Sequence, residues 1–123
     1  MILGYDAGSN VMDTFCVTLD DGYILFHDSG DDEVSKPQFN DPAFGDAEEG
    51  SATMNTGTSV QDSNSAGGTI NHAHLTKQDG TIMAQATCGL ADTEFIFSSL
   101  TVAAGESLTI TLLTCTVTTY PLT

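Results

Sequence analysis

Two histidines separated by a single residue form the first candidate site for chemistry in this sequence. His72 and His74 lie in the stretch Thr69 to Thr76, which alternates as a strand does. Side chains two positions apart on a strand point to the same face, so both imidazoles can approach one metal ion. A third ligand must then come from His27, the remaining histidine, or from a His pair on each subunit around a three-fold axis. The simpler interpretation, two polar side chains on the solvent face of a strand, is favoured, and we assign no metal and no cofactor.

A second candidate is the acidic stretch from Asp28 to Glu33, which reads Asp-Ser-Gly-Asp-Asp-Glu. Hard cations such as Ca²⁺ bind several carboxylate and carbonyl oxygens at once. The stretch lacks the alternating oxygen ligands and the sixth-position glycine of an EF-hand loop. A solvated acidic turn is therefore the favoured interpretation.

Residue patterns typical of catalysis are absent from the sequence. It contains no Gly-x-Ser-x-Gly elbow for a nucleophilic serine. Gly67-Gly68 is not followed by the Lys and Ser or Thr of a phosphate-binding loop. With 17 acidic residues, a pair of carboxylates suited to glycoside hydrolysis arises by chance. We predict that the protein is not an enzyme.

The charge balance restricts the partners of this chain. The 17 acidic residues face two lysines and no arginine, for a formal net charge of −15. Nucleic-acid binding requires cationic side chains that displace counterions from phosphates, and anionic membranes attract basic segments. We therefore expect neither a nucleic-acid nor a membrane partner. An acidic exterior suits a protein that must stay soluble on the outside of a particle.

The three cysteines, Cys16, Cys88 and Cys115, form an odd set that argues against a disulfide framework. A single bridge between Cys88 and Cys115 remains open. The N-terminus lacks the charged start and apolar run of a signal peptide, and no stretch approaches membrane-spanning length. We expect the protein to be made and assembled in a cytoplasm.

The elements that must position these residues are mostly strands. Apolar residues at helical spacing predict a short helix over residues 10–20, capped by Ser9 or Asn10 and stopped at Asp21-Gly22. Tyr23 to His27 is an apolar strand, Asp79-Gly80 marks a hairpin, and Ser107 to Thr118 is the longest strand. About seven short strands separated by turns predict one mainly β domain over residues 1–123. Its expected form is an antiparallel β-sandwich, of jelly-roll or immunoglobulin-like type, with one short N-terminal helix.

Two aromatic residues flank a proline-containing loop and have two interpretations. Phe39 and Phe44 enclose Asp41-Pro42. Buried aromatic side chains dominate the energy of protein interfaces, so the pair is a candidate subunit contact. In the alternative interpretation, both rings fold back and cap the sandwich.

Four segments follow one another in a recognisable order. They are Asp21-Gly22-Tyr23-Ile24-Leu25-Phe26, Asp41-Pro42-Ala43-Phe44-Gly45, Lys77-Gln78-Asp79-Gly80-Thr81, and the run from Leu100 to Thr111 around Ala104-Gly105. This order, preceded by a helix that ends in glycine, resembles that of a widespread group of small bacteriophage structural proteins. The resemblance covers nearly the whole chain and implies a β-sandwich component of a virus particle, repeated by symmetry.

The resemblance implies a role in assembly. We expect a virion protein, most simply a capsid decoration (cement) protein that binds the major capsid protein and stabilises the head shell as a trimer. The alternative is a module of the tail, fibre or adsorption apparatus that recognises a host surface.

Overall fold

One helix lies near the N-terminal end of the described residues and buries a stripe of small and apolar side chains. The computed structural model describes residues 2–117 and 119–120. Helix α1 (Tyr5–Val17) buries Gly8, Met12 and Cys16, a stripe at four-residue spacing. The predicted N-terminal helix is confirmed, but its predicted bounds, residues 10–20, are wrong at both ends. The helix begins after Gly4, whose extended backbone forms the N-cap. The negative carboxylate of Asp6 in the first turn stabilises the helix through its attraction to the positive end of the helix dipole.

The described strands are short, and they combine into one larger sheet and several ladders. In chain order they are β1 (Leu3–Gly4), β2 (Tyr23–His27), β3 (Glu33–Ser35), β4 (Ser51–Thr53), β5 (Val60–Asp62), β6 (Gly68–Thr69), β7 (His72–Thr76), β8 (Ile82–Gly89), β9 (Phe95–Ile96), β10 (Thr101–Val102), β11 (Leu108–Ile110), β12 (Thr114–Thr116) and β13 (Thr119–Tyr120). The described residues form a five-stranded sheet in the order β3-β2-β7-β8-β9 and the two-stranded ladders β1–β13, β4–β12, β5–β11 and β6–β10. The prediction of a mainly β protein with one short N-terminal helix is confirmed. Most pairs are antiparallel, whereas β8–β9 and β1–β13 are parallel.

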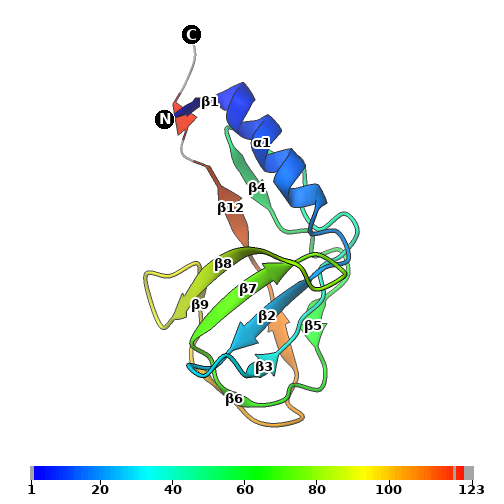
Figure 1. Cartoon of the computed structure of the whole chain (residues 1–123), viewed down its shortest axis with the longest axis vertical. Coiled ribbons are helices and arrows are strands. Elements are labelled where there is room, and N and C mark those ends of the chain that lie inside the picture. The colour runs from blue at the N-terminus through cyan, green and yellow to red at the C-terminus, as the bar shows by residue number, and fades with distance from the viewer. Residues whose placement is uncertain (1, 118, 121–123) are drawn as a thin grey trace.

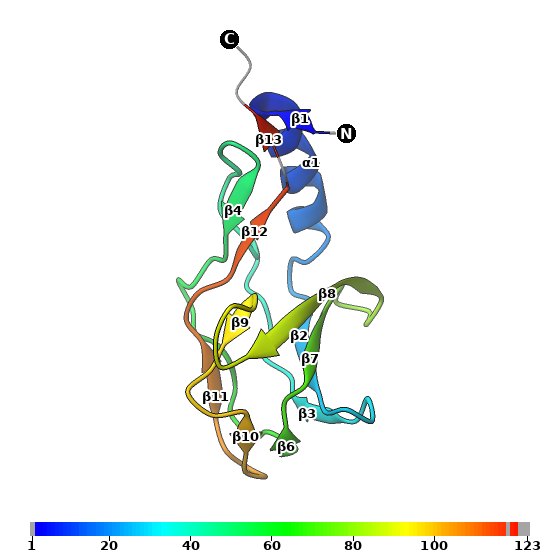
Figure 2. The ribbon, with the colours of Figure 1, turned by 90° about the vertical axis from the view of Figure 1, so that its left-hand side faces the viewer.

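The elements are arranged along one long axis. The five-stranded sheet curls through the lower part of the molecule, with β5 and β11 across from it (Figures 1 and 2). Helix α1 and the β4–β12 ladder form the upper part, where β1 and β13 also pair (Figure 1). The C-terminal stretch passes from the lower part to the upper part through β11 and β12.

The predicted long strand from Ser107 to Thr118 is divided. Residues 111–113 belong to no strand, because β11 pairs with β5 and β12 pairs with β4, at two different places in the fold. Strict alternation would bury Leu112 with Ile110, but the interruption exposes Leu112 and buries Leu113. Thr118, the last residue of the predicted strand, lies outside the described residues.

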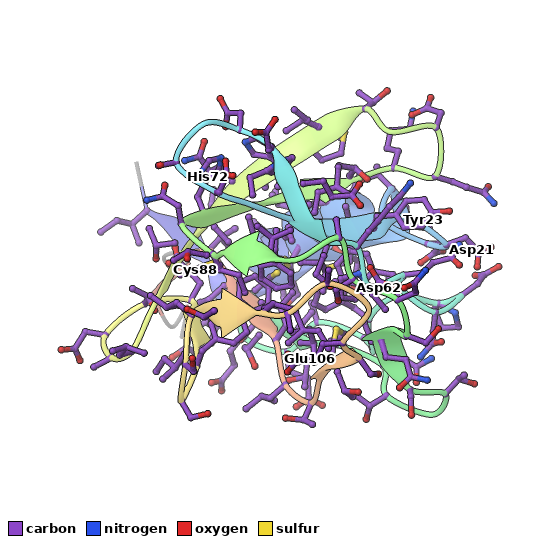
Figure 3. The ribbon with its side chains drawn as sticks, turned by 90° about the horizontal axis from the view of Figure 1, so that it is seen from below. Asp21, Tyr23, Asp62, His72, Cys88 and Glu106 are labelled. Carbon is purple, nitrogen blue, oxygen red and sulfur yellow. The ribbon has the colours of Figure 1, made fainter. Side chains whose placement is uncertain are left out.

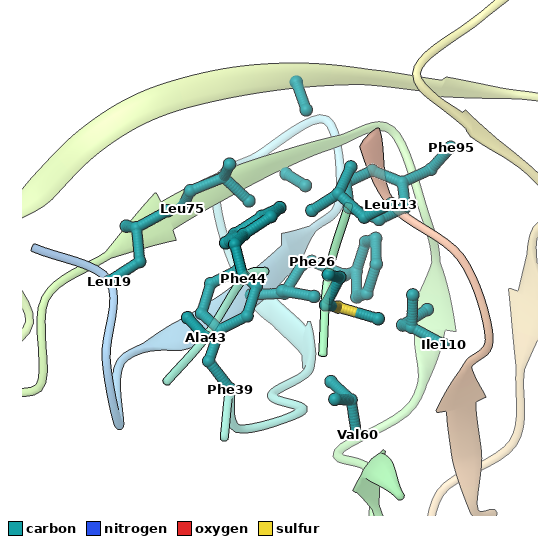
Figure 4. Close-up of a cluster of buried hydrophobic side chains, with 14 of the residues drawn as sticks. Leu19, Phe26, Phe39, Ala43, Phe44, Val60, Leu75, Phe95, Ile110 and Leu113 are labelled. Atoms are coloured by element: carbon teal, nitrogen blue, oxygen red, sulfur yellow. The ribbon is translucent and has the colours of Figure 1, made fainter. Parts of the chain in front are cut away.

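A continuous apolar core fills the inside of the curl. Phe26 of β2 contacts the rings of Phe95 and Phe97 edge-on, with ring centres 5.1 and 5.5 Å apart. Figure 4 shows Phe26 in one cluster with residues from the helix end, the sheet and the strands opposite it. Edge-to-face aromatic pairs add to the free energy gained from burial alone.

The junction between α1 and β2 depends on a glycine. The helix ends at Val17, and turns lead to Gly22, whose amide donates to the Leu19 carbonyl over 2.8 Å. A β-carbon at Gly22 would overlap the backbone carbonyl oxygen of Thr76. The helix therefore ends before the predicted stop at Asp21-Gly22, and Gly22 instead permits a close approach of two backbones.

We expect Gly22→Ala to destabilise the protein by about 3 kcal/mol or more, because the obstacle is backbone that cannot rotate away. The free energy of unfolding in urea, followed by circular dichroism, measures the effect. Gly45→Ala is the matched control, since its nearest contact, the Thr53 carbonyl oxygen at 3.8 Å, is an ordinary one. Equal unfolding midpoints for the two variants would contradict the prediction.

Candidate functional site

The outer face of the five-stranded sheet brings the three histidines of the chain together. Antiparallel pairing of β2 with β7 sets His27 opposite His72 and Leu25 opposite His74. The ring centres lie 5.4 Å apart for His27 and His72, 4.8 Å for His27 and His74, and 5.1 Å for His72 and His74. We call these three residues the histidine cluster. The structure therefore places the two predicted residues on one face and adds His27 to them.

The side chains of the cluster differ in their hydrogen bonding. His72 lies between two oxygens, with Nδ1 2.9 Å from Asn71 Oδ1 and Nε2 2.8 Å from Asp31 Oδ1. His74 shares a hydrogen bond with the Gln85 side chain of β8. Both ring nitrogens of His27 are buried without a hydrogen-bond partner among the described residues. Buried polar atoms almost always have a partner, so His27 is the exception in this cluster.

Two carboxylates of the acidic stretch beside the cluster make different contacts. Asp28 Oδ1 accepts from the amides of Gly30 (2.8 Å) and Asp32 (3.0 Å), which closes the loop between β2 and β3. The exposed Asp31 reaches His72 instead, and Figure 3 shows His72 next to this cyan loop. As the side chains stand, no group of three His, Cys, Asp or Glu residues in residues 2–117 is arranged to hold a metal ion.

Phe39 and Phe44 lie within the core of the chain itself. Their exposed fractions are 2% and 5%, and their ring centres are 5.6 Å apart. The Asp20 carboxylate accepts from the amide of Ala43 over 2.8 Å, which fixes the loop that carries Phe44. Both rings are therefore buried within the single chain, and a role of Phe39 and Phe44 in a subunit contact stays a prediction.

A polar groove that the sequence analysis did not single out lies beside this loop. It has a volume of about 520 Å³, and its lining is rich in carboxylate and amide side chains. They include Asp21, Gln38, Asn40, Asp41, Asn55 and Gln61. Asn40 holds the opposite wall by donating to the carbonyls of Asn55 (2.8 Å) and Thr58 (2.7 Å). The residues come from three separate segments of the chain, so no local sequence pattern indicates the groove.

The three thiols are free, and the bridge between Cys88 and Cys115 is not formed. Burial raises the pKa of Cys16 and of Cys88 to about 12, and that of Cys115 to about 11. Since the thiolate is the reactive form, these cysteines act as small apolar side chains near neutral pH.

Comparison with protein families, with curated proteins and with solved structures finds no match to this chain. Within the described residues, no helix has the length and apolar character needed to cross a membrane.

The histidine cluster makes stability depend on pH. Burial, and then the neighbouring His27 and His72, lower the pKa of His74, while Asp31 and the Gln85 hydrogen bond oppose this shift. Below about pH 6.5, the ordinary pKa of histidine, the folded state then binds fewer protons at His74 than the unfolded state does. The stabilisation is present above that pH and is lost as the pH falls through the lowered pKa.

We expect His74→Gln to flatten the decrease in unfolding free energy between neutral pH and about pH 5, because glutamine keeps a polar side chain without the titration. Urea unfolding at several pH values measures this decrease. Titration of the carboxylates is common to both proteins and cancels in the difference. Identical pH profiles for wild type and variant would contradict the prediction.

Proposed function

We propose that this protein is a structural component of a bacteriophage virion, most simply a capsid decoration protein that binds the major capsid protein and stabilises the head shell. It works by assembly, as a trimer repeated by symmetry, and carries out no catalytic step. The order of turn and strand segments from Asp21-Gly22 to Ala104-Gly105 supports the phage assignment. The predicted sandwich is part of this proposal, with the β5–β11 and β6–β10 ladders as the layer opposite the five-stranded sheet.

The observation that carries the assembly role is a groove with exposed apolar side chains along an open sheet edge. Strand β9 is the last strand of its sheet, and β11 pairs with β5 alone. A groove of about 310 Å³ lies next to β9, with Ile96 and Leu112 among its lining residues. These side chains are 65% and 66% exposed. Exposed apolar side chains along an unpaired strand edge are the features that protein partners cover.

The charge of the chain supports an exposed position on a particle. With a formal charge of −15, neighbouring copies repel one another through solvent and resist clumping. Among the described residues that line the groove beside β9, Glu94 is the charged one, and the exposed Ile96 and Leu112 lie in the same lining. Many weak apolar contacts, repeated by particle symmetry, then supply the affinity.

We expect Ile96→Asp combined with Leu112→Asp to weaken binding to capsids stripped of this protein by at least about tenfold, the equivalent of 1.4 kcal/mol. Co-sedimentation of the variant with stripped capsids measures the binding. Val11→Asp is the matched control, because Val11 is 47% exposed on α1, away from β9. Virions that lack the protein and withstand heat and osmotic shock unchanged would contradict the decoration role.

A role in host recognition is the second candidate, and the polar groove beside Phe39 favours it. Carboxylate and amide side chains around a buried aromatic ring can hydrogen-bond polar groups of a surface ligand. In that case the protein belongs to the tail or fibre rather than to the shell.

The copy number per virion separates the two roles, and quantitative gel analysis of purified virions measures it. For a decoration protein we expect hundreds of copies, because shell symmetry repeats the site many times. A small multiple of three or six would place the protein in the tail. Competition of the recombinant protein with phage adsorption would then support host recognition.

A further inference from the structure

The spacing of the histidine cluster is that of three ligands around one tetrahedral metal ion. Metal–nitrogen bonds of about 2.1 Å at tetrahedral angles place the centres of coordinating imidazole rings about 5 Å apart. The ring centres of His27, His72 and His74 are separated by 4.8, 5.1 and 5.4 Å. We propose that these three residues of one chain bind a single Zn²⁺ ion. This inference does not depend on the virion role.

The buried nitrogens of His27 give an independent indication of a ligand. Neither Nδ1 nor Nε2 of this ring has a hydrogen-bond partner among the described residues. A buried ring without partners costs free energy that coordination of a metal recovers. His27 lies beside the other two histidines rather than in the apolar core, so an ion held by the cluster reaches it.

The rings must rotate before their nitrogens converge. The ring planes are inclined by 25° for His27 and His72, 55° for His27 and His74, and 62° for His72 and His74. In this arrangement they do not form a metal centre within the described part of the chain. The backbone already holds the three residues in register through the β2–β7 pairs, so turning the side chains is the change required. His72 and His74 are only partly buried, and His72 must give up the 2.9 Å contact between its Nδ1 and Asn71 Oδ1 as it turns.

The chemistry of the surroundings selects the kind of ion. Three neutral imidazoles suit Zn²⁺ and similar transition metals, whereas Ca²⁺ and Mg²⁺ require oxygen ligands. Asp31 Oδ1 lies 2.8 Å from His72 Nε2. When the other nitrogen of His72 binds the metal, this carboxylate takes the outer position commonly found behind metal-binding histidines. The acidic loop that carries Asp31 also attracts a divalent cation to this face.

The test uses the full-length recombinant protein, freed of metal with EDTA and titrated with zinc chloride in a calorimeter. We expect one Zn²⁺ per chain in the micromolar range, a raised melting temperature, and no equivalent effect of calcium or magnesium chloride. Protonation of the histidines must compete with the metal, so the affinity must fall below about pH 6. In the wild-type protein, the imidazole ¹⁵N resonances of all three histidines must shift on addition of zinc.

Variants distinguish zinc binding by the histidine cluster from zinc binding by the acidic residues. His72→Gln must abolish the one-to-one binding, and Asp31→Asn must weaken it by about tenfold to a hundredfold. Asp6→Asn, which removes one exposed carboxylate from α1, is the control and must leave the affinity unchanged. The NMR titration on the wild type tests whether the three histidines bind zinc even if a histidine variant fails to fold.

Three results would overturn the proposal. The first is the absence of zinc binding below the millimolar range. The second is binding that His72→Gln leaves intact, which would place the ion on carboxylates. The third is one zinc ion per three chains, which would mean that the histidines of separate subunits share it.

Discussion

The approach of two backbones at Gly22 sets the geometry on which both faces of the sheet depend. The chain leaves α1, turns, and passes so close to the Thr76 carbonyl that a β-carbon has no room. From this point β2 runs antiparallel to β7, with Tyr23 opposite Thr76 and His27 opposite His72. The Gly22 carbonyl also accepts from the Phe39 amide over 2.9 Å, which holds the next loop against the same junction. A larger residue at this position would displace the start of the sheet and everything aligned with it.

The same strand pairing serves the core on one side and the histidines on the other. Ile24 and Phe26 of β2 are buried on the inner face, together with Ala73 and Leu75 of β7. The alternate residues of both strands carry the histidine cluster on the outer face. Because side chains alternate along a strand, a shift of one residue would exchange the two faces. The burial of the apolar residues therefore fixes where the imidazoles lie, even though the imidazoles add little to the core.

The C-terminal third of the chain shows how the interruption between β11 and β12 exposes apolar side chains. β11 and β12 need different partners, β5 and β4, which lie at different places along the long axis. The interruption between them turns Leu112 outward and Leu113 inward. β9 is the last strand of its sheet, and Ile96 and Leu112 line the groove beside it. A sheet that continued beyond β9 would cover these side chains, whereas the open edge leaves them available to a partner.

The local features of this protein follow from its sequence, whereas contacts between distant segments bring these features together in the fold. Strand β2, the Asp-Gly hairpin between β7 and β8, and the outward side of His72 and His74 follow from alternation and turn chemistry, which act over a few residues. The start of α1 was missed because its first turns carry little apolar pattern and are held by packing at Gly8. The division of the last strand, the inward position of Phe39 and Phe44, and the meeting of His27 with the other histidines depend on contacts between distant segments. Local periodicity carries no information about which strands pair, so those features required the fold itself.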